Sequence, residues 1–104
     1  MASRADMLKE FLAQNPTDAF ARYGLAMEYR NAGDTAGALR EFDALLQANP
    51  DYTAAYFMAA QTLASAGRND EAKQRLRAGI ASAERTGNQH AKSEMSAMLE
   101  ELGG

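Results

Sequence analysis

The hydrophobic and polar positions along the chain follow a helical pattern, and no stretch alternates between the two as a strand does. Good helix formers such as alanine, leucine, glutamate and methionine dominate, valine is absent, and Ile80 is the single isoleucine. Proline and glycine interrupt the pattern and divide it into segments. The sequence therefore predicts an all-α fold of six helices, at about 3–14, 18–31, 35–48, 52–65, 69–86 and 89–102.

Several of these segments carry end signals. Ser3 and Asp34 precede helical stretches and are suited to accept hydrogen bonds from free N–H groups of a first turn. Gly87 is suited to a left-handed residue after a helix. Because the connections are only two to four residues long, successive helices are expected to lie antiparallel.

The breakers repeat at a fixed interval. Asn15-Pro16 and Asn49-Pro50 are 34 residues apart, and Ala32-Gly33 and Ala66-Gly67 keep the same distance. When the chain is overlaid on itself at this shift, breakers, small residues and core-sized apolar residues coincide, whereas charged positions scatter. This is what a repeated helix–turn–helix preserves, and such a repeat buries its apolar face only by stacking on neighbours.

At this interval the chain resembles the tetratricopeptide repeat (TPR) family. The matching residues in 19–52 are Leu25, Ala26, Tyr29, Gly33, Asp34, Ala38, Phe42 and Pro50. In 53–86 they are Tyr56, Ala59, Ala60, Leu63, Gly67, Ala72, Leu76 and Gly79. The resemblance implies an α-solenoid of antiparallel helix pairs, in which Ala26 and Ala38, and Ala60 and Ala72, allow close approach. Departures from the family pattern are Arg22 for an aromatic residue, Leu45 for a small one and Glu84 for a closing proline.

The two ends fit half-repeats. We expect one TPR-like domain over 1–104, with an N-terminal half-repeat helix in 1–16 and a C-terminal capping helix in 87–104. Between them lie repeat 1 in 17–50 and repeat 2 in 51–86. The N-terminal helix resembles the second helix of a repeat, and Met95, Met98, Leu99 and Leu102 keep the spacing of a first helix.

Composition and charge narrow the classes of function. The chain has no cysteine, and its formal charge of −3 argues against a nucleic-acid partner. No run of about 18 apolar residues exists to span a membrane, and no apolar leader opens the sequence. A cytoplasmic protein without a membrane partner is the expectation.

The sequence shows no catalytic constellation. His90 is the only histidine and has no cysteine or second histidine with which to bind zinc, and glycine-rich phosphate loops are absent. We therefore expect a non-enzymatic protein with no cofactor and no metal site. An enzyme dependent on His90 is the remote alternative.

The resemblance implies a concave groove lined by the first helix of each repeat, which would bind a protein or peptide. The residues expected there are Phe20, Tyr23, Met27, Arg30, Asn31, Phe57, Met58 and Gln61. The lysine and asparagine positions with which chaperone-binding relatives grip a carboxylate are not matched. Aromatic and methionine side chains instead suit an apolar peptide or helix. In the other interpretation, Phe20, Tyr23 and Phe57 are covered by neighbouring helices and serve the core.

A second hypothesis concerns the N-terminal helix. Met7, Leu8 and Phe11 would face the absent first helix of its repeat and lie open. Because exposed apolar patches often mark interfaces, a homodimer through these residues is the alternative function.

Overall fold

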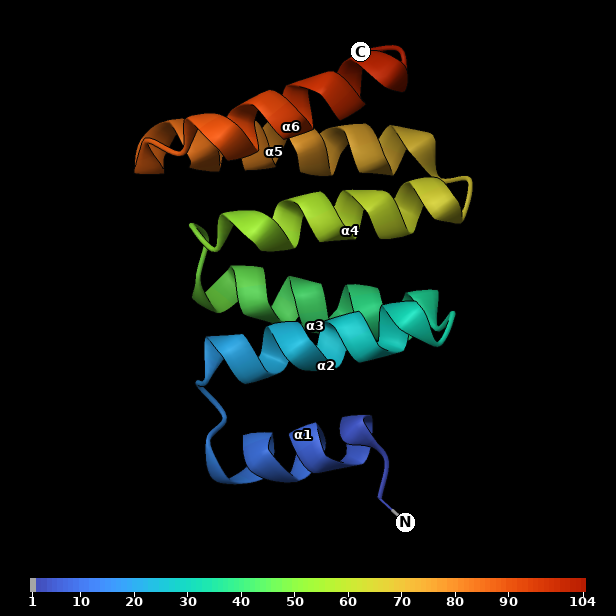
Figure 1. The fold of residues 1–104 in the computed structure, drawn as a ribbon, viewed down its shortest axis with the longest axis vertical. Helices are drawn as coiled ribbons and strands as arrows, with labels where there is room; N and C mark the ends of the chain where they lie inside the picture. Colours follow the sequence, from blue (N-terminus) through green and yellow to red (C-terminus); the bar gives the residue numbers. More distant parts are fainter. Residues whose placement is uncertain (1) are drawn as a thin grey trace. The chain divides into compact units, whose positions relative to one another are not determined.

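The computed structural model describes residues 2–104, and these residues form six helices and no strand (Figure 1). The helices are α1 (Arg4–Gln14), α2 (Ala19–Asn31), α3 (Thr35–Ala48), α4 (Thr53–Ser65), α5 (Asn69–Thr86) and α6 (Gln89–Glu101). The predicted all-α class is confirmed, and each predicted helix boundary lies within one residue of the observed one.

Contacts between residues divide the chain into two compact units. Unit 1 is Met1–Asn49 and contains α1, α2 and α3, whereas unit 2 is Pro50–Gly104 and contains α4, α5 and α6. The division falls at the second Asn-Pro pair of the sequence, where proline cannot continue the preceding helix. Each unit is described by itself below.

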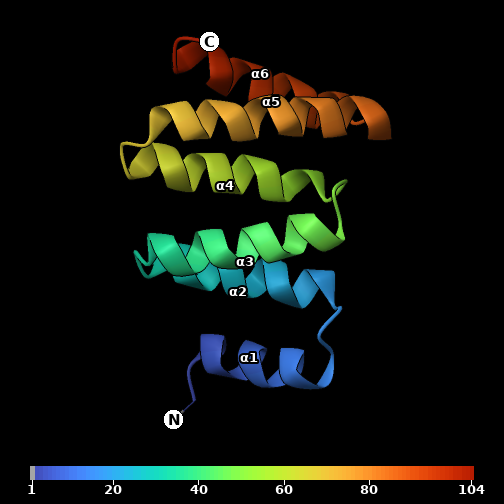
Figure 2. The ribbon, with the colours of Figure 1, turned by 180° about the vertical axis from the view of Figure 1, so that it is seen from behind.

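Unit 1 is built around the antiparallel pair α2 and α3, which lie side by side in Figures 1 and 2. Ala26 and Ala38 are fully buried in this pair, together with Phe42. Helix α1 packs on α2, where Leu12 joins Leu25 in a small apolar cluster. Small residues at the contact let two helix backbones approach closely, as the sequence predicted.

Unit 2 is built around the antiparallel pair α4 and α5, with α6 packed on α5 and touching α4 (Figures 1 and 2). Ala60, Ala72 and Leu76 are fully buried. Gly79 of α5 is also needed for close packing, because a Cβ there would lie 2.6 Å from Cβ of Tyr56 and closer still to Sδ of Met95. Tyr56 of α4 and Met95 of α6 thus both lie against Gly79 of α5.

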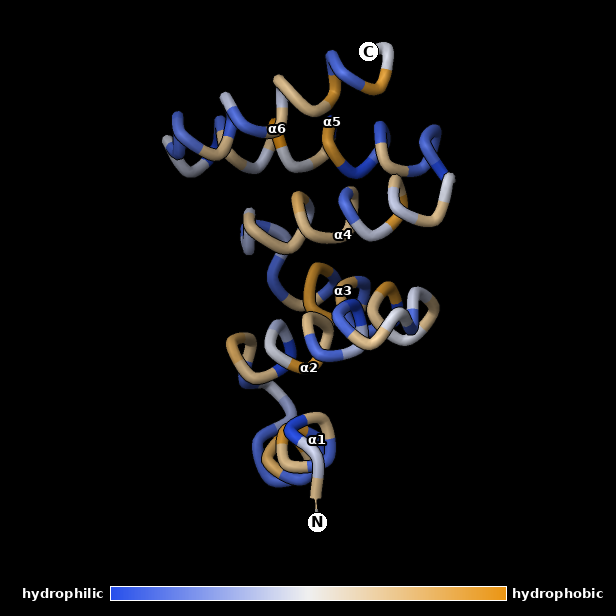
Figure 3. The backbone as a smooth tube through the Cα atoms, turned by 45° about the vertical axis from the view of Figure 1, so that its right-hand side comes forward, coloured by the Kyte–Doolittle hydropathy of each residue, from blue (hydrophilic) through white to orange (hydrophobic). Residues whose placement is uncertain are grey.

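The helix ends follow local rules. Ser3 accepts a hydrogen bond from the Asp6 N–H while Asp6 accepts one from the Ser3 N–H, so the first helix starts with a capping box. Asp34 caps α3 through the N–H of Gly37. Gly87 ends α5 with a φ of 69°, which confirms the predicted left-handed residue. In Figure 3, apolar and polar residues follow one another along α5 and α6.

Candidate partner-binding site

An apolar groove runs between α1 and α2 in unit 1. Its volume is about 430 Å³, which falls within the ~300–1,000 Å³ of typical ligand sites. We call it the α1–α2 groove and define it by its ten lining residues: Arg4, Leu8, Phe11, Asp18, Phe20, Ala21, Tyr23, Gly24, Met27 and Glu28.

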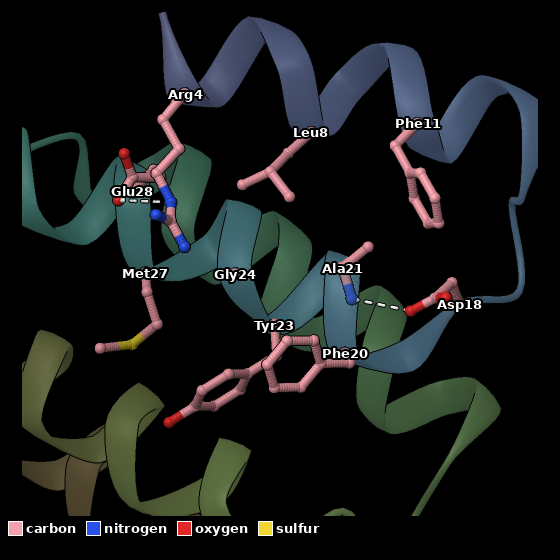
Figure 4. A pocket seen from close by; sticks show the side chains of 10 residues that line it. All are labelled: Arg4, Leu8, Phe11, Asp18, Phe20, Ala21, Tyr23, Gly24, Met27 and Glu28. Atoms are coloured by element: carbon pink, nitrogen blue, oxygen red, sulfur yellow. Dashed lines mark hydrogen bonds and ion pairs between the residues drawn. The ribbon is translucent and has the colours of Figure 1, made fainter.

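Two exposed aromatic rings stand in this groove. Phe20 is 79% exposed and Phe11 is 46% exposed, although both are large and apolar. Figure 4 shows Leu8 and Phe11 pointing from α1 toward α2, the helix that carries Phe20. Such paired exposure of aromatic side chains is a feature of interaction surfaces, because a rigid ring contributes a large contact area.

Tyr23 and Met27 form the part of the groove that is closer to the core. The ring of Tyr23 meets that of Phe42 edge to face, with centroids 6.2 Å apart, and both Tyr23 and Met27 are half-buried. The alternative interpretation, in which aromatic residues of this stripe serve the core, therefore describes Tyr23 but not Phe20. Among the large apolar side chains of unit 1, Phe20 is the most exposed.

The charged residues of the groove interact with their neighbours. Nε of Arg4 lies 3.8 Å from a carboxylate oxygen of Glu28, and Asp18 accepts a 2.9 Å hydrogen bond from the Ala21 N–H as the N-cap of α2 (Figure 4). Between them the lining is Leu8, Phe11, Phe20, Ala21 and Gly24. The middle of the groove therefore offers apolar contact.

One expectation about the N-terminal helix is wrong. Leu8 was expected to lie open with Met7 and Phe11, but it is half-buried and packs on the Leu12–Leu25 cluster. Its Cδ1 is 3.6 Å from the place of a Cβ on Gly24, which is an ordinary contact distance, so the leucine lies directly over this part of α2. Met7 is 59% exposed, as expected, but it is not among the residues that line the groove.

The structure also adds residues that the pattern did not single out. Arg4, Asp18, Gly24 and Glu28 line the groove, whereas Arg30 and Asn31 of the expected set do not. The match of the N-terminal helix to the second helix of a repeat could have indicated these residues. If the N-terminal helix lacks its partner, its open face and the adjoining face of the next helix must form one surface.

The expected residues of α4 lie in unit 2. Phe57 lines a hollow of about 210 Å³ with Ala54, His90 and Met95, and a neighbouring hollow of about 400 Å³ with Gln61 and Met98. Phe57, Met58 and Gln61 are all half-buried. Unit 2 thus has two hollows of mixed polar and apolar lining between α4 and α6.

His90 lies on the surface at the start of α6. Its Nε2 is 3.0 Å from a carboxylate oxygen of Glu94, one helical turn away. Within residues 2–104, no group of three or more metal-binding side chains is placed to hold a metal ion. Over the same residues, no helix is long and apolar enough to cross a membrane.

The antiparallel pairs, small residues at their contacts and 34-residue interval together define an α-helical repeat protein. The family model for the tetratricopeptide repeat matches residues 29–94. The chain belongs to the tetratricopeptide repeat family, whose members are in general modules for protein–protein interaction.

Relatives support the same assignment. The TPR repeat-containing protein PA0015 of Pseudomonas aeruginosa is 30% identical over 95 residues, which cover 91% of this chain and 90% of that protein. Among solved structures, protein BPP2914 of Bordetella parapertussis has a TM-score of 0.85 at 27% identity, over 99% of this chain and 90% of that one. A tetratricopeptide repeat domain protein of Salinibacter ruber has a TM-score of 0.76 at 30% identity, over 84% and 97% respectively.

Proposed function

We propose that this protein is a non-enzymatic interaction module that binds a segment of a partner protein in the α1–α2 groove. The observation that supports the proposal most is the joint exposure of Phe20 and Phe11 in one apolar groove. Burying one such ring stabilises a complex by about 1.5–3 kcal/mol. The groove thus contains two strong candidate anchors for a partner.

Phe20 is a better probe of this function than Tyr23. Because Tyr23 packs on Phe42, its truncation would disturb the core as well as the surface. Phe20 is 79% exposed, so Phe20→Ala removes a groove side chain with little effect on folding.

We expect Phe20→Ala to weaken binding of a purified partner by about tenfold or more, as loss of an interface anchor does. Crosslinking and mass spectrometry would supply the partner, and calorimetry would supply its Kd. Met7→Ala is the matched control, because Met7 is also apolar and exposed but is not one of the groove residues. Equal affinities of the Phe20→Ala variant and the unaltered protein would overturn the proposal.

A homodimer through α1 is the second candidate, and the exposure of Met7 and Phe11 favours it. Covering these side chains with those of another copy would remove apolar surface from water. Sedimentation over a concentration series tests this function. A strict monomer at millimolar concentration would eliminate it.

A further inference from the structure

In unit 2, one helix packs against a pair of helices, and unit 1 contains the equivalent pair without that helix. Shifts of 34 and 68 residues place α1 on α3 and α5, so Leu8 corresponds to Phe42 and Leu76. In the tetratricopeptide pattern, α1 and α5 match the second helix of a repeat. Helices α2 and α6 match the first helix of the repeat that follows. The pair α1–α2 is therefore equivalent to the pair α5–α6, against which α4 packs.

We propose that the α1–α2 groove binds one α-helix of a partner protein, in the place that α4 occupies against α5 and α6. This inference rests on the proposed function and specifies the form and chemistry of the bound segment. The helix is uncharged and alanine-rich on its buried face, like α4, whose thirteen residues include no charged side chain.

Burial at equivalent positions supports this inference. Phe42 and Leu76, each packed in a pair with the helix before it, are fully buried, whereas their equivalent Leu8 is only half-buried. Leu45 is 1% exposed and Gly79 is buried, whereas their equivalent Phe11 is 46% exposed. In the complete pairs, Tyr23 of the preceding helix meets Phe42, and Tyr56 of the preceding helix lies against Gly79. Within residues 2–104, unit 1 supplies no such helix to α1.

The chemistry of the groove favours a helix over an extended peptide. An extended segment leaves its N–H and C=O groups in need of partners, and the groove is lined by two helices whose own backbone groups are bonded internally. A helix brings its backbone hydrogen bonds with it. The charged side chains of the groove already have partners, because Arg4 lies near Glu28 and Asp18 caps α2. A charge on the buried face of the bound helix would therefore lie in the groove without a partner, so that face is uncharged.

The size of Phe11 sets a further requirement. In unit 2, Gly79 leaves room for Tyr56 of α4, but Phe11 stands at the equivalent position of α1. Two large side chains at this point would overpack the contact. The bound helix must therefore place a small residue opposite Phe11, where α4 has Tyr56.

The probe is a capped synthetic peptide with the sequence of residues 53–65 and the change Tyr56→Ala, added to the full chain. We expect amide shifts in NMR spectra at Phe11, Phe20 and Gly24, and helical transferred NOEs in the peptide. A second peptide with the additional change Ala60→Pro cannot form the helix and is the control. Equal binding by the proline peptide would overturn the inference and leave the proposed function standing.

A size exchange tests the register. The unaltered chain should prefer the Tyr56→Ala peptide over the Tyr56 peptide by about tenfold, and Phe11→Ala should reverse that order. Circular dichroism checks that Phe11→Ala folds. Phe20→Ser, at a groove position that is 79% exposed, should weaken binding of both peptides without changing their order. An unchanged preference in Phe11→Ala would overturn the proposed register.

The remaining outcomes also decide the matter. Shifts at Gly79 in place of Gly24 would show that the peptide displaces α4, and would count against the groove. If the chain alone forms a dimer in which the amides of Phe11 and Phe20 are protected from hydrogen exchange, a second copy fills the groove. That result would overturn the inference. No response at millimolar peptide would do the same. Loss of partner binding in Phe20→Ala, measured separately, would still support the proposed function.

Discussion

At the scale of single residues, two helical glycines of this chain perform different tasks. Gly24 faces Leu8 across an ordinary contact distance, whereas Gly79 is enclosed by Tyr56 and Met95. Glycine within a helix costs about 0.5–1 kcal/mol relative to alanine, so both positions sacrifice intrinsic helix stability. Only the second has a packing reason for doing so.

We expect Gly24→Ala to raise the free energy of unfolding by about 0.5–1 kcal/mol, because its Cβ meets Cδ1 of Leu8 at 3.6 Å. Gly79→Ala should lower it by about 1–3 kcal/mol, because its Cβ would lie 2.6 Å from Cβ of Tyr56. Urea unfolding of both variants measures the difference. Similar shifts of the same sign would contradict the packing described for unit 2.

Charge interactions on the surface are local. The side chain of Arg68 hydrogen-bonds Glu71 and lowers the pKa of that carboxyl from its ordinary value. A lowered pKa in the folded state means that the pair stabilises the fold above the unfolded-state pKa. This contribution is lost as the pH falls through the folded-state value.

We expect Arg68→Gln to raise the pKa of the Glu71 carboxyl toward its ordinary value, as followed by NMR titration of the side chain. Stability near neutral pH should change little, because both groups are about half exposed and solvent screens the pair. Arg40→Gln, in unit 1, is the control and should not change the pKa of the Glu71 carboxyl.

At the scale of helices, the start of α4 depends on α5. Its N-cap is Tyr52, which makes no side-chain capping bond, whereas the equivalent Asp18 caps α2. Arg85 of α5 instead donates to Asp51 at 2.9 Å, and the hydroxyls of Ser82 and Thr53 are 2.8 Å apart. Contacts between the two helices thus position the first turn of α4.

We expect Ser82→Ala to lower the free energy of unfolding by about 1 kcal/mol, the typical value of one buried hydrogen bond. Ser82 is fully buried, and its hydroxyl also donates to Asp51. Removing this hydroxyl therefore takes a hydrogen-bond partner from both Asp51 and Thr53, at the start of α4. Ser65→Ala, at an exposed position of α4, should have almost no effect. Thermal unfolding measures both, and equal melting temperatures would contradict this role of Ser82.

At the scale of the whole molecule, stability is distributed unevenly along the chain. Leu12 is the only buried residue of α1 and Met95 the only one of α6, whereas α3, α4 and α5 bury five or six residues each. In repeat proteins, each element gains stability mainly from its immediate neighbours. The first and last helices therefore contribute least.

We expect amide hydrogen exchange to be fastest in α1 and α6 and slowest within α4 and α5, because opening a helix with one buried side chain exposes little apolar surface. Mass spectrometry of peptic fragments measures this order. A helix bound in the α1–α2 groove should slow exchange in α1 and leave α6 unaffected. Greater protection of α1 than of α4 in the chain alone would contradict this account.

The sequence by itself determined the helices, their ends and the repeat. These features depend on interactions within a few residues, such as Ser3 with Asp6, or on an interval that the breakers display directly. The all-α class and the family follow from them. The predicted repeat boundaries and the expected partner-binding residues remain predictions.

Only the tertiary structure decided which apolar side chains are left exposed. Tyr23 and Phe20 lie on the same helix, yet one packs on Phe42 and the other extends into water. Leu8 is half-buried against α2, whereas Phe11, three residues later, remains partly open. Exposure depends on which helix lies opposite, and that neighbour is set by packing between distant parts of the chain, which a local pattern does not contain.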